Sequence, residues 1–192
     1  MFADAAEFLL RTGFDLLACA FFLRFWMQWA RVPFRNAFGQ FVVKVTDFAV
    51  KPLRRVIPGL FGLDWASLIP LFLAELLSVL AISAVLGYPF AAAGAGVLPG
   101  FLLLALTAVV RLSLYVLMGV ILIQAVISWV NPFSPHAPVF YALSRPVLGP
   151  FARVIPPIGG IDLSPMAALI VLQLALVAPV AALERYARGL VW

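Results

Sequence analysis

The 192 residues are 65% apolar and only 11% charged, with a formal net charge of +5 and a mean hydropathy of +1.12. A soluble domain is nearer half apolar and a quarter charged, so this chain cannot cover its apolar surface with its own polar residues, and a bilayer is its expected solvent. The basic residues are few and local, which favours membrane topology and lipid headgroups over phosphate contacts, and no nucleic-acid partner is expected.

The chain begins with MFADAAEFLLRTGFD, in which Asp4 and Glu7 stand where a signal peptide carries basic residues, so we expect this segment to be retained. Stretches apolar enough for transmembrane helices follow at 8–29, 65–86, 111–129 and 163–183. A further apolar segment, 98–110, precedes the third span. It is either an interfacial helix or a tilted continuation of that span.

The segment between the first two spans has helical periodicity. Over 36–51, apolar residues recur at helical spacing and polar residues occupy the opposite side, which predicts an amphipathic helix in the headgroup plane, capped by Asn36. Its apolar side comprises Phe38, Phe41, Val42, Val45 and Ala49, and its polar side Gln40, Lys44, Asp47 and Lys51. The corresponding connector in the second half, 134–156, is more apolar, and we expect Pro146 to interrupt it.

One phrase occurs twice, each time directly before a span. PLRRVIPGLFGLD covers Pro52–Asp64 and PFARVIPPIGGIDLSP covers Pro150–Pro165. Arg111 aligns with Arg11 at an offset of 100 residues, and the phrases align at an offset of 98. We therefore divide the chain into repeats 1–97 and 98–192. The predicted fold is an all-α membrane protein with four transmembrane helices in two parallel repeats, each a helical hairpin with an interfacial amphipathic connector helix.

Loop charges predict the orientation. Eight basic residues lie in the two connectors and four lie near the opposite ends of the spans, so the connectors are expected in the cytoplasm and both termini on the other side. The connector residues are Arg31, Arg35, Lys44, Lys51, Arg54, Arg55, Arg145 and Arg153, and the opposing residues are Arg11, Arg111, Arg185 and Arg188.

The connectors also supply the candidate binding residues. Contact with anionic lipid or a protein partner is assigned to Lys44, Lys51, Arg54, Arg55, Arg145 and Arg153. For Arg55 and Arg153 the alternative is snorkelling, with no specific site. Asp64 and Asp162 precede the second and fourth spans. We interpret both as helix caps, with a cation or proton site as the alternative.

Polar residues inside the spans occupy matching positions in the two repeats. We predict an Arg24–Glu75 ion pair in the first repeat and a Gln124–Gln173 amide hydrogen bond in the second, because an unpaired charge in hydrocarbon is costly. Their simplest role is to hold helices together, and a transport pathway is the alternative.

The sequence suggests no catalytic chemistry. It contains no Ser-His-Asp, Cys-His or paired-carboxylate arrangement and no phosphate-binding loop. One cysteine, Cys19, and one histidine, His136, exclude an intramolecular disulfide, a CxxC site and a multi-histidine metal site. We expect no catalytic residue, metal or cofactor.

The segments LRFWMQWARVPFRNAFGQFVVKVTDFAVKPLRRVIP and SWVNPF…ARVIPPIGGIDLSPMAALIVLQ resemble the YggT family of bacterial inner-membrane proteins, to which YlmG-type proteins are related. The resemblance covers about Asp15 to Leu174. It implies a multi-pass protein of the bacterial inner membrane without established catalysis, whose relatives are linked to osmotic-stress tolerance, cell division and assembly of a haem-bearing cytochrome.

The expected function is therefore a non-enzymatic membrane scaffold or assembly factor. Its cytoplasmic face would engage a protein partner, a second copy of itself or anionic lipid. The alternative is a transporter or channel component in osmotic or ion homeostasis, which would need connected polar groups across the middle of the membrane.

Overall fold

The structure, a computed structural model, describes residues 2–57, 63–156 and 162–192. The central parts of both repeated phrases, residues 58–62 and 157–161, lie outside the described residues. The described part is built of helices. They are α1 (Phe2–Trp29), α2 (Ala37–Val56), α3 (Trp65–Val85), α4 (Phe90–Ala93), η1 (Ala95–Val97), α5 (Leu98–Val130), α6 (Ala137–Val154), α7 (Ser164–Ala175), the π-helical turn η2 (Leu176–Val180) and α8 (Ala181–Gly189).

Three segments are long and apolar enough to cross a membrane: Trp65–Val85, Ala95–Val130 and Ser164–Gly189. They correspond to three of the four predicted spans. The fourth prediction, residues 8–29, falls in α1, a 28-residue helix in which Arg11, Asp15 and Arg24 lower the hydropathy. Its passage through the membrane stays a prediction.

Helix α5 decides between the two interpretations of residues 98–110. The 33 residues of α5 form one helix from Leu98 to Val130, about 50 Å long at 1.5 Å per residue. This exceeds the hydrocarbon thickness of about 30 Å. The lead-in therefore continues the third predicted span.

Helix α2 is longer than predicted, and helix α6 is continuous where an interruption was predicted. Asn36 caps α2 as predicted, its Oδ1 accepting the Gly39 N–H at 2.7 Å, but α2 then runs through Pro52 to Val56. The prediction that Pro146 interrupts the second connector is wrong, because α6 continues through Pro146 and Pro150. Burial of Leu143 and Leu148 against neighbouring helices offsets the backbone hydrogen bonds that the prolines remove.

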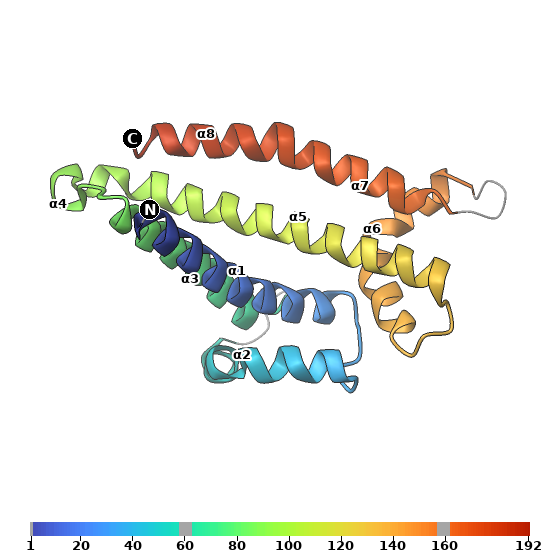
Figure 1. The fold of residues 1–192 in the computed structure, drawn as a ribbon. Helices are drawn as coiled ribbons and strands as arrows, with labels where there is room; N and C mark the ends of the chain where they lie inside the picture. The colour runs from blue at the N-terminus through green and yellow to red at the C-terminus, as the bar shows by residue number, and fades with distance from the viewer. Residues whose placement is uncertain (1, 58–62, 157–161) are drawn as a thin grey trace.

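Figure 1 shows the arrangement of the helices. Both termini lie at the end that carries α4, and α6 lies at the opposite end. Helices α1 and α5 run away from the termini, and α3 and the α7–η2–α8 segment return. Helix α5 is central, because it contacts α1, α3, α6, α7 and α8. Helix α2 packs beneath α1 and α3.

The packed interior joins the two halves of the chain. Phe21 and Leu71 belong to one buried cluster with Leu117 of α5. Trp26 makes a more specific link, its indole N–H donating to the Leu143 carbonyl of α6 at 2.8 Å. This is a direct hydrogen bond between the predicted repeats.

We expect Trp26→Phe to lower the free energy of unfolding by about 1 kcal/mol, because the Leu143 carbonyl loses a half-buried donor. The matched control is Trp29→Phe, since the Trp29 side chain is exposed. Reversible unfolding in mixed detergent micelles measures both. Equal effects of the two substitutions would contradict a role for this hydrogen bond.

Candidate functional site

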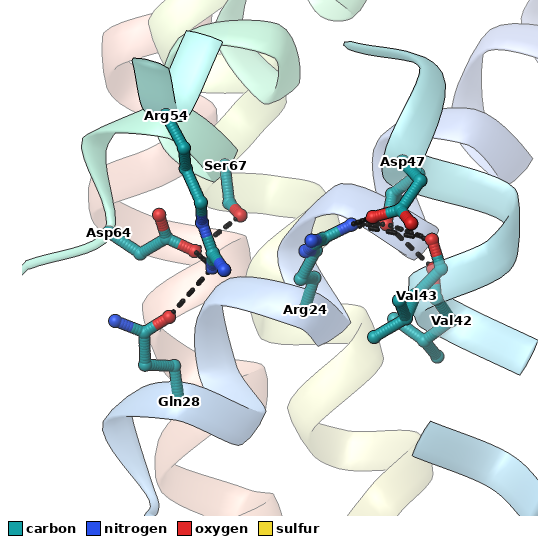
Figure 2. Close-up of polar contacts among 9 residues, drawn as sticks. Arg24, Gln28, Val42, Val43, Asp47, Arg54, Asp64 and Ser67 are labelled. Carbon is teal, nitrogen blue, oxygen red and sulfur yellow. Dashed lines mark hydrogen bonds and ion pairs between the residues drawn. The ribbon is translucent and has the colours of Figure 1, made fainter. Parts of the chain in front are cut away.

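Arg24 of α1 is buried and bonds to the connector helix α2. Its Nη1 lies 2.8 Å from Asp47 Oδ1 and 2.7 Å from Thr46 Oγ1, and it donates a longer bond of 3.3 Å to the Val43 carbonyl (Figure 2). Only 5% of the Arg24 side chain is exposed, against 41% for Asp47. The ion pair therefore fixes α2 against α1.

The predicted Arg24–Glu75 ion pair is wrong. Glu75 Oε1 is buried without a hydrogen-bond partner, and the partners of Arg24 lie in α2. The reason is that Arg24 and Glu75 lie at different distances from the connector ends of their helices. Arg24 is five residues from the end of α1, about 7.5 Å, whereas Glu75 is ten residues inside α3, about 15 Å. The Arg24 side chain reaches toward the connector, where Asp47 is available.

The predicted Gln124–Gln173 hydrogen bond is also wrong. Gln124 Oε1 is buried without a hydrogen-bond partner, and Gln173 is exposed on α7. Helix α7 thus packs on α5 with a face that does not include Gln173, and neither predicted pair forms in the structure.

Asp64 is buried at the N-cap position of α3, and its carboxylate binds side chains. Oδ2 accepts hydrogen bonds from Arg54 Nη2 and Ser67 Oγ, both at 2.6 Å, and Arg54 also donates to Gln28 Oε1 at 2.9 Å (Figure 2). No backbone N–H of α3 bonds to the Asp64 side chain. The carboxylate thus joins α2 to α3.

Asp162 lies one residue before Leu163, the N-cap position of α7, so it does not occupy the predicted cap position. Its Oδ1 accepts the backbone N–H of Ser164, the first residue of α7, at 2.9 Å, and its side chain is exposed. In the described residues, no group of three or more His, Cys, Asp or Glu side chains is placed to hold a metal ion.

The six basic residues predicted to contact lipid or a partner divide into two kinds. Arg54 is engaged by Asp64 and Gln28. Arg54 is nevertheless exposed, as are the other five: Lys44, Lys51, Arg55, Arg145 and Arg153. Three of these lie on α2, where they follow one side of the helix.

Helix α2 has three faces. Val42, Thr46 and Val50 are fully buried against the protein. Phe41, Val45 and Phe48 point outward, with 64%, 37% and 67% of each residue exposed. The basic side chains of Lys44, Lys51 and Arg55 lie beyond this apolar face. The predicted apolar side is thus split, since part of it packs on the protein and part stays open.

The repeats differ at the connector end. The position in the second repeat that corresponds to Arg54 is Ala152, so Asp162 has no equivalent of the Arg54 ion pair. A cavity of about 500 Å³ is present there, lined by Gln124, Ser128 and Asp162 among others. In the first repeat the corresponding region contains the Arg54–Asp64 ion pair.

A second polar region lies among the helices, toward the termini, and was not predicted. Two adjoining cavities, each about 280 Å³, are lined by Arg11 and Asp15 of α1, Glu75 of α3 and Arg111 of α5. The one sequence signal for this region is the alignment of Arg11 with Arg111 at the starts of two predicted spans. We call this region the charged cavity.

Its arginines are already paired. Arg11 bonds to Glu7 at 2.9 Å, Arg111 to Glu184 at 3.1 Å, and Arg188 to the same Glu184 at 2.6 Å. The Arg111–Glu184 contact connects α5 to α8, whereas the other two pairs lie within α1 and within α8. The Glu75 carboxylate has no such contact within the described part of the chain.

Comparison with known proteins agrees with the resemblance in both halves. A family model described as CCB3/YggT matches residues 3–85 and 103–183. A protein of Vibrio alginolyticus from the proC 3' region is 36% identical over 173 residues, covering 90% of this chain and 91% of the relative. The YggT protein of Escherichia coli (strain K12) is 36% identical over 170 residues, covering 88% and 86%. A Pseudomonas aeruginosa protein is 36% identical over 172 residues, covering 88% and 85%.

These relatives are described as uncharacterised, so they supply a family and no activity. No solved structure matches the chain. The match covers both halves of the chain and includes three helices that are apolar enough to cross a membrane. The chain belongs to the CCB3/YggT family.

Proposed function

We propose that the protein is a non-enzymatic scaffold or assembly factor of the bacterial inner membrane, and that it acts through the connector side. The observation that carries this proposal is the outer surface of α2. There Phe41, Val45 and Phe48 are exposed on a helix that is anchored to the protein by its opposite face, and basic residues lie beside them.

This surface suits the boundary between headgroups and hydrocarbon. Phenylalanine on the apolar face of an amphipathic helix inserts at that depth, and each lysine or arginine near anionic lipid contributes about 1 kcal/mol of attraction. The exposed Lys44, Lys51 and Arg55 supply that charge. Anchoring by Arg24–Asp47 and Arg54–Asp64 holds the helix in place, so the surface is already formed before a partner arrives.

In this proposal the connectors face the cytoplasm, following their excess of basic residues. A protein partner would approach α2 from that side, and anionic lipid would surround it. Self-association through the exposed apolar faces of the long helices is compatible with the same role. The scaffold has no need for an active site.

The alternative function is a transporter or channel component, and one observation favours it. The charged cavity brings Arg11, Asp15, Glu75 and Arg111 together between α1, α3 and α5. A pathway would also need polar groups that continue toward the connectors, whereas the next residues in that direction, such as Phe21, Phe22 and Leu71, form an apolar cluster. The geometry therefore supports the scaffold better.

Photocrosslinking in native membranes separates the two functions. A photoreactive amino acid at Phe48 should crosslink a consistent protein partner, identified by mass spectrometry, because this position is exposed on α2. The matched control is Leu77, an exposed position on α3 that would face lipid. A specific partner at Phe48 alone supports the scaffold. Crosslinks only between copies of this chain, together with ion flux in proteoliposomes, would support transport.

The lipid part of the proposal predicts a change in lipid retention. We expect Lys44→Gln, Lys51→Gln and Arg55→Gln together to reduce the anionic phospholipid retained by the purified protein about tenfold or more. Native mass spectrometry after detergent extraction counts the bound lipids. Arg185→Gln, an exposed arginine on α8, is the control. Unchanged lipid in the triple variant would exclude a lipid role for this face.

A further inference from the structure

Glu75 lies at the middle of a membrane-spanning helix. It is ten residues from each end of α3, Trp65 and Val85, or about 15 Å from either end. The helix length of about 31 Å matches one hydrocarbon thickness. A carboxylate at this depth is costly unless something compensates for its charge.

The surroundings of Glu75 provide no direct compensation. Only 3% of the residue is exposed, and its Oε1 has no hydrogen-bond partner. The side chain lines both parts of the charged cavity. A buried polar group without a partner in a native fold calls for a ligand that the protein alone does not supply.

The charges of the cavity are unequal. Its described lining holds four carboxylates, from Glu7, Asp15, Glu75 and Glu184, against three guanidinium groups, from Arg11, Arg111 and Arg188. All three guanidinium groups are bonded to Glu7 or Glu184. Glu7 and Glu184 balance two of the three guanidinium charges, and Asp15 and Glu75 carry the other two negative charges, so the lining as a whole has one negative charge in excess.

Residues with neutral hydroxyl groups line the cavity together with this pair. Ser78 and Thr107 line the same cavity and are buried, at 4% and 2% exposure. Thr107 Oγ1 donates to the Leu104 carbonyl at 2.8 Å and keeps free lone pairs. Tyr115 adds a phenolic oxygen to the lining. Carboxylate and hydroxyl oxygens are the ligand types preferred by hard cations.

We propose that the charged cavity binds one monovalent metal cation, Na⁺ or K⁺, through the carboxylates of Asp15 and Glu75 with help from the hydroxyl groups of Ser78 and Thr107. One positive charge brings the lining to neutrality. A divalent cation would leave an excess positive charge beside three guanidinium groups, and an anion would add to an existing negative charge. The site does not depend on the scaffold function, and it requires no passage of the ion across the membrane.

Direct binding tests the proposal on the full chain in detergent micelles. Radioactive ²²Na⁺ and ⁸⁶Rb⁺, the latter as a tracer for K⁺, should bind at about one ion per chain. Glu75→Gln should weaken binding about tenfold or more, because the ion loses a charged ligand, and Asp15→Asn should act in the same direction. Asp4→Asn, the same chemical change at an exposed carboxyl of α1 that does not line the cavity, should leave binding unchanged.

Thermal unfolding gives a second measurement. The melting temperature of the wild type should rise with the logarithm of NaCl or KCl concentration, relative to choline chloride at equal ionic strength. Glu75→Gln should remove this dependence while the variant remains folded. Equal melting curves in NaCl, KCl and choline chloride would overturn the proposal. A second outcome would also overturn it: the wild type binds no tracer, and Glu75→Gln raises the melting temperature by the same amount in every salt. A protonated, uncharged Glu75 would then account for the burial of this side chain without a bound cation.

Discussion

Asp47→Ala is expected to lower the free energy of unfolding by about 2–3 kcal/mol, one of the two largest effects that the structure predicts. The substitution leaves the Arg24 guanidinium buried without its carboxylate partner. Breaking a buried ion pair typically costs 3–5 kcal/mol. The smaller figure follows because Asp47 is partly exposed and because Thr46 Oγ1 and the Val43 carbonyl still accept hydrogen bonds from Arg24.

The companion variant tests the cause. Arg24→Met with Asp47→Ala removes the buried charge together with its partner, so the double variant should be more stable than Asp47→Ala alone. Glu7→Ala is the matched control. It breaks the exposed Glu7–Arg11 pair and should cost about 0.5 kcal/mol. Unfolding in mixed micelles measures all three variants. A double variant no more stable than the single one would show that Arg24 is not the source of the loss.

The sequence predicted local features and failed at side-chain pairing. The periodicity of residues 36–51 placed the connector helix and its Asn36 cap, because capping depends on a few neighbouring residues. Three of the four predicted spans correspond to helices that are apolar enough to cross a membrane.

Pairing depends on how helices pack, which periodicity does not give. Polar residues at matching positions in the two repeats suggested that Arg24 forms an ion pair with Glu75. The packing of α2 against α1 instead places Asp47 next to Arg24. The charged cavity escaped prediction for the same reason. Its residues come from α1, α3, α5 and α8, so no short stretch of sequence contains the pattern. Asp15 and Glu75 are 60 positions apart in the chain.

The second large effect separates the two copies of the repeated phrase. Asp64→Ala should lower the free energy of unfolding by about 2–3 kcal/mol, whereas Asp162→Ala at the corresponding position should cost about 1 kcal/mol or less. Asp64 is buried and accepts bonds from both Arg54 and Ser67. Asp162 is exposed and accepts a single backbone bond from Ser164.

Two measurements check this difference. Unfolding in mixed micelles gives the two free energies. Limited trypsin digestion reports on the connector, because loss of Asp64 frees Arg54 and releases the end of α2 from α3. Cleavage after Lys51, Arg54 or Arg55 should become faster in Asp64→Ala, whereas Asp162→Ala should leave cleavage at these sites unchanged. Equal destabilisation by the two variants would mean that both aspartates act only as helix caps, and that the Arg54 ion pair does not hold α2 in place.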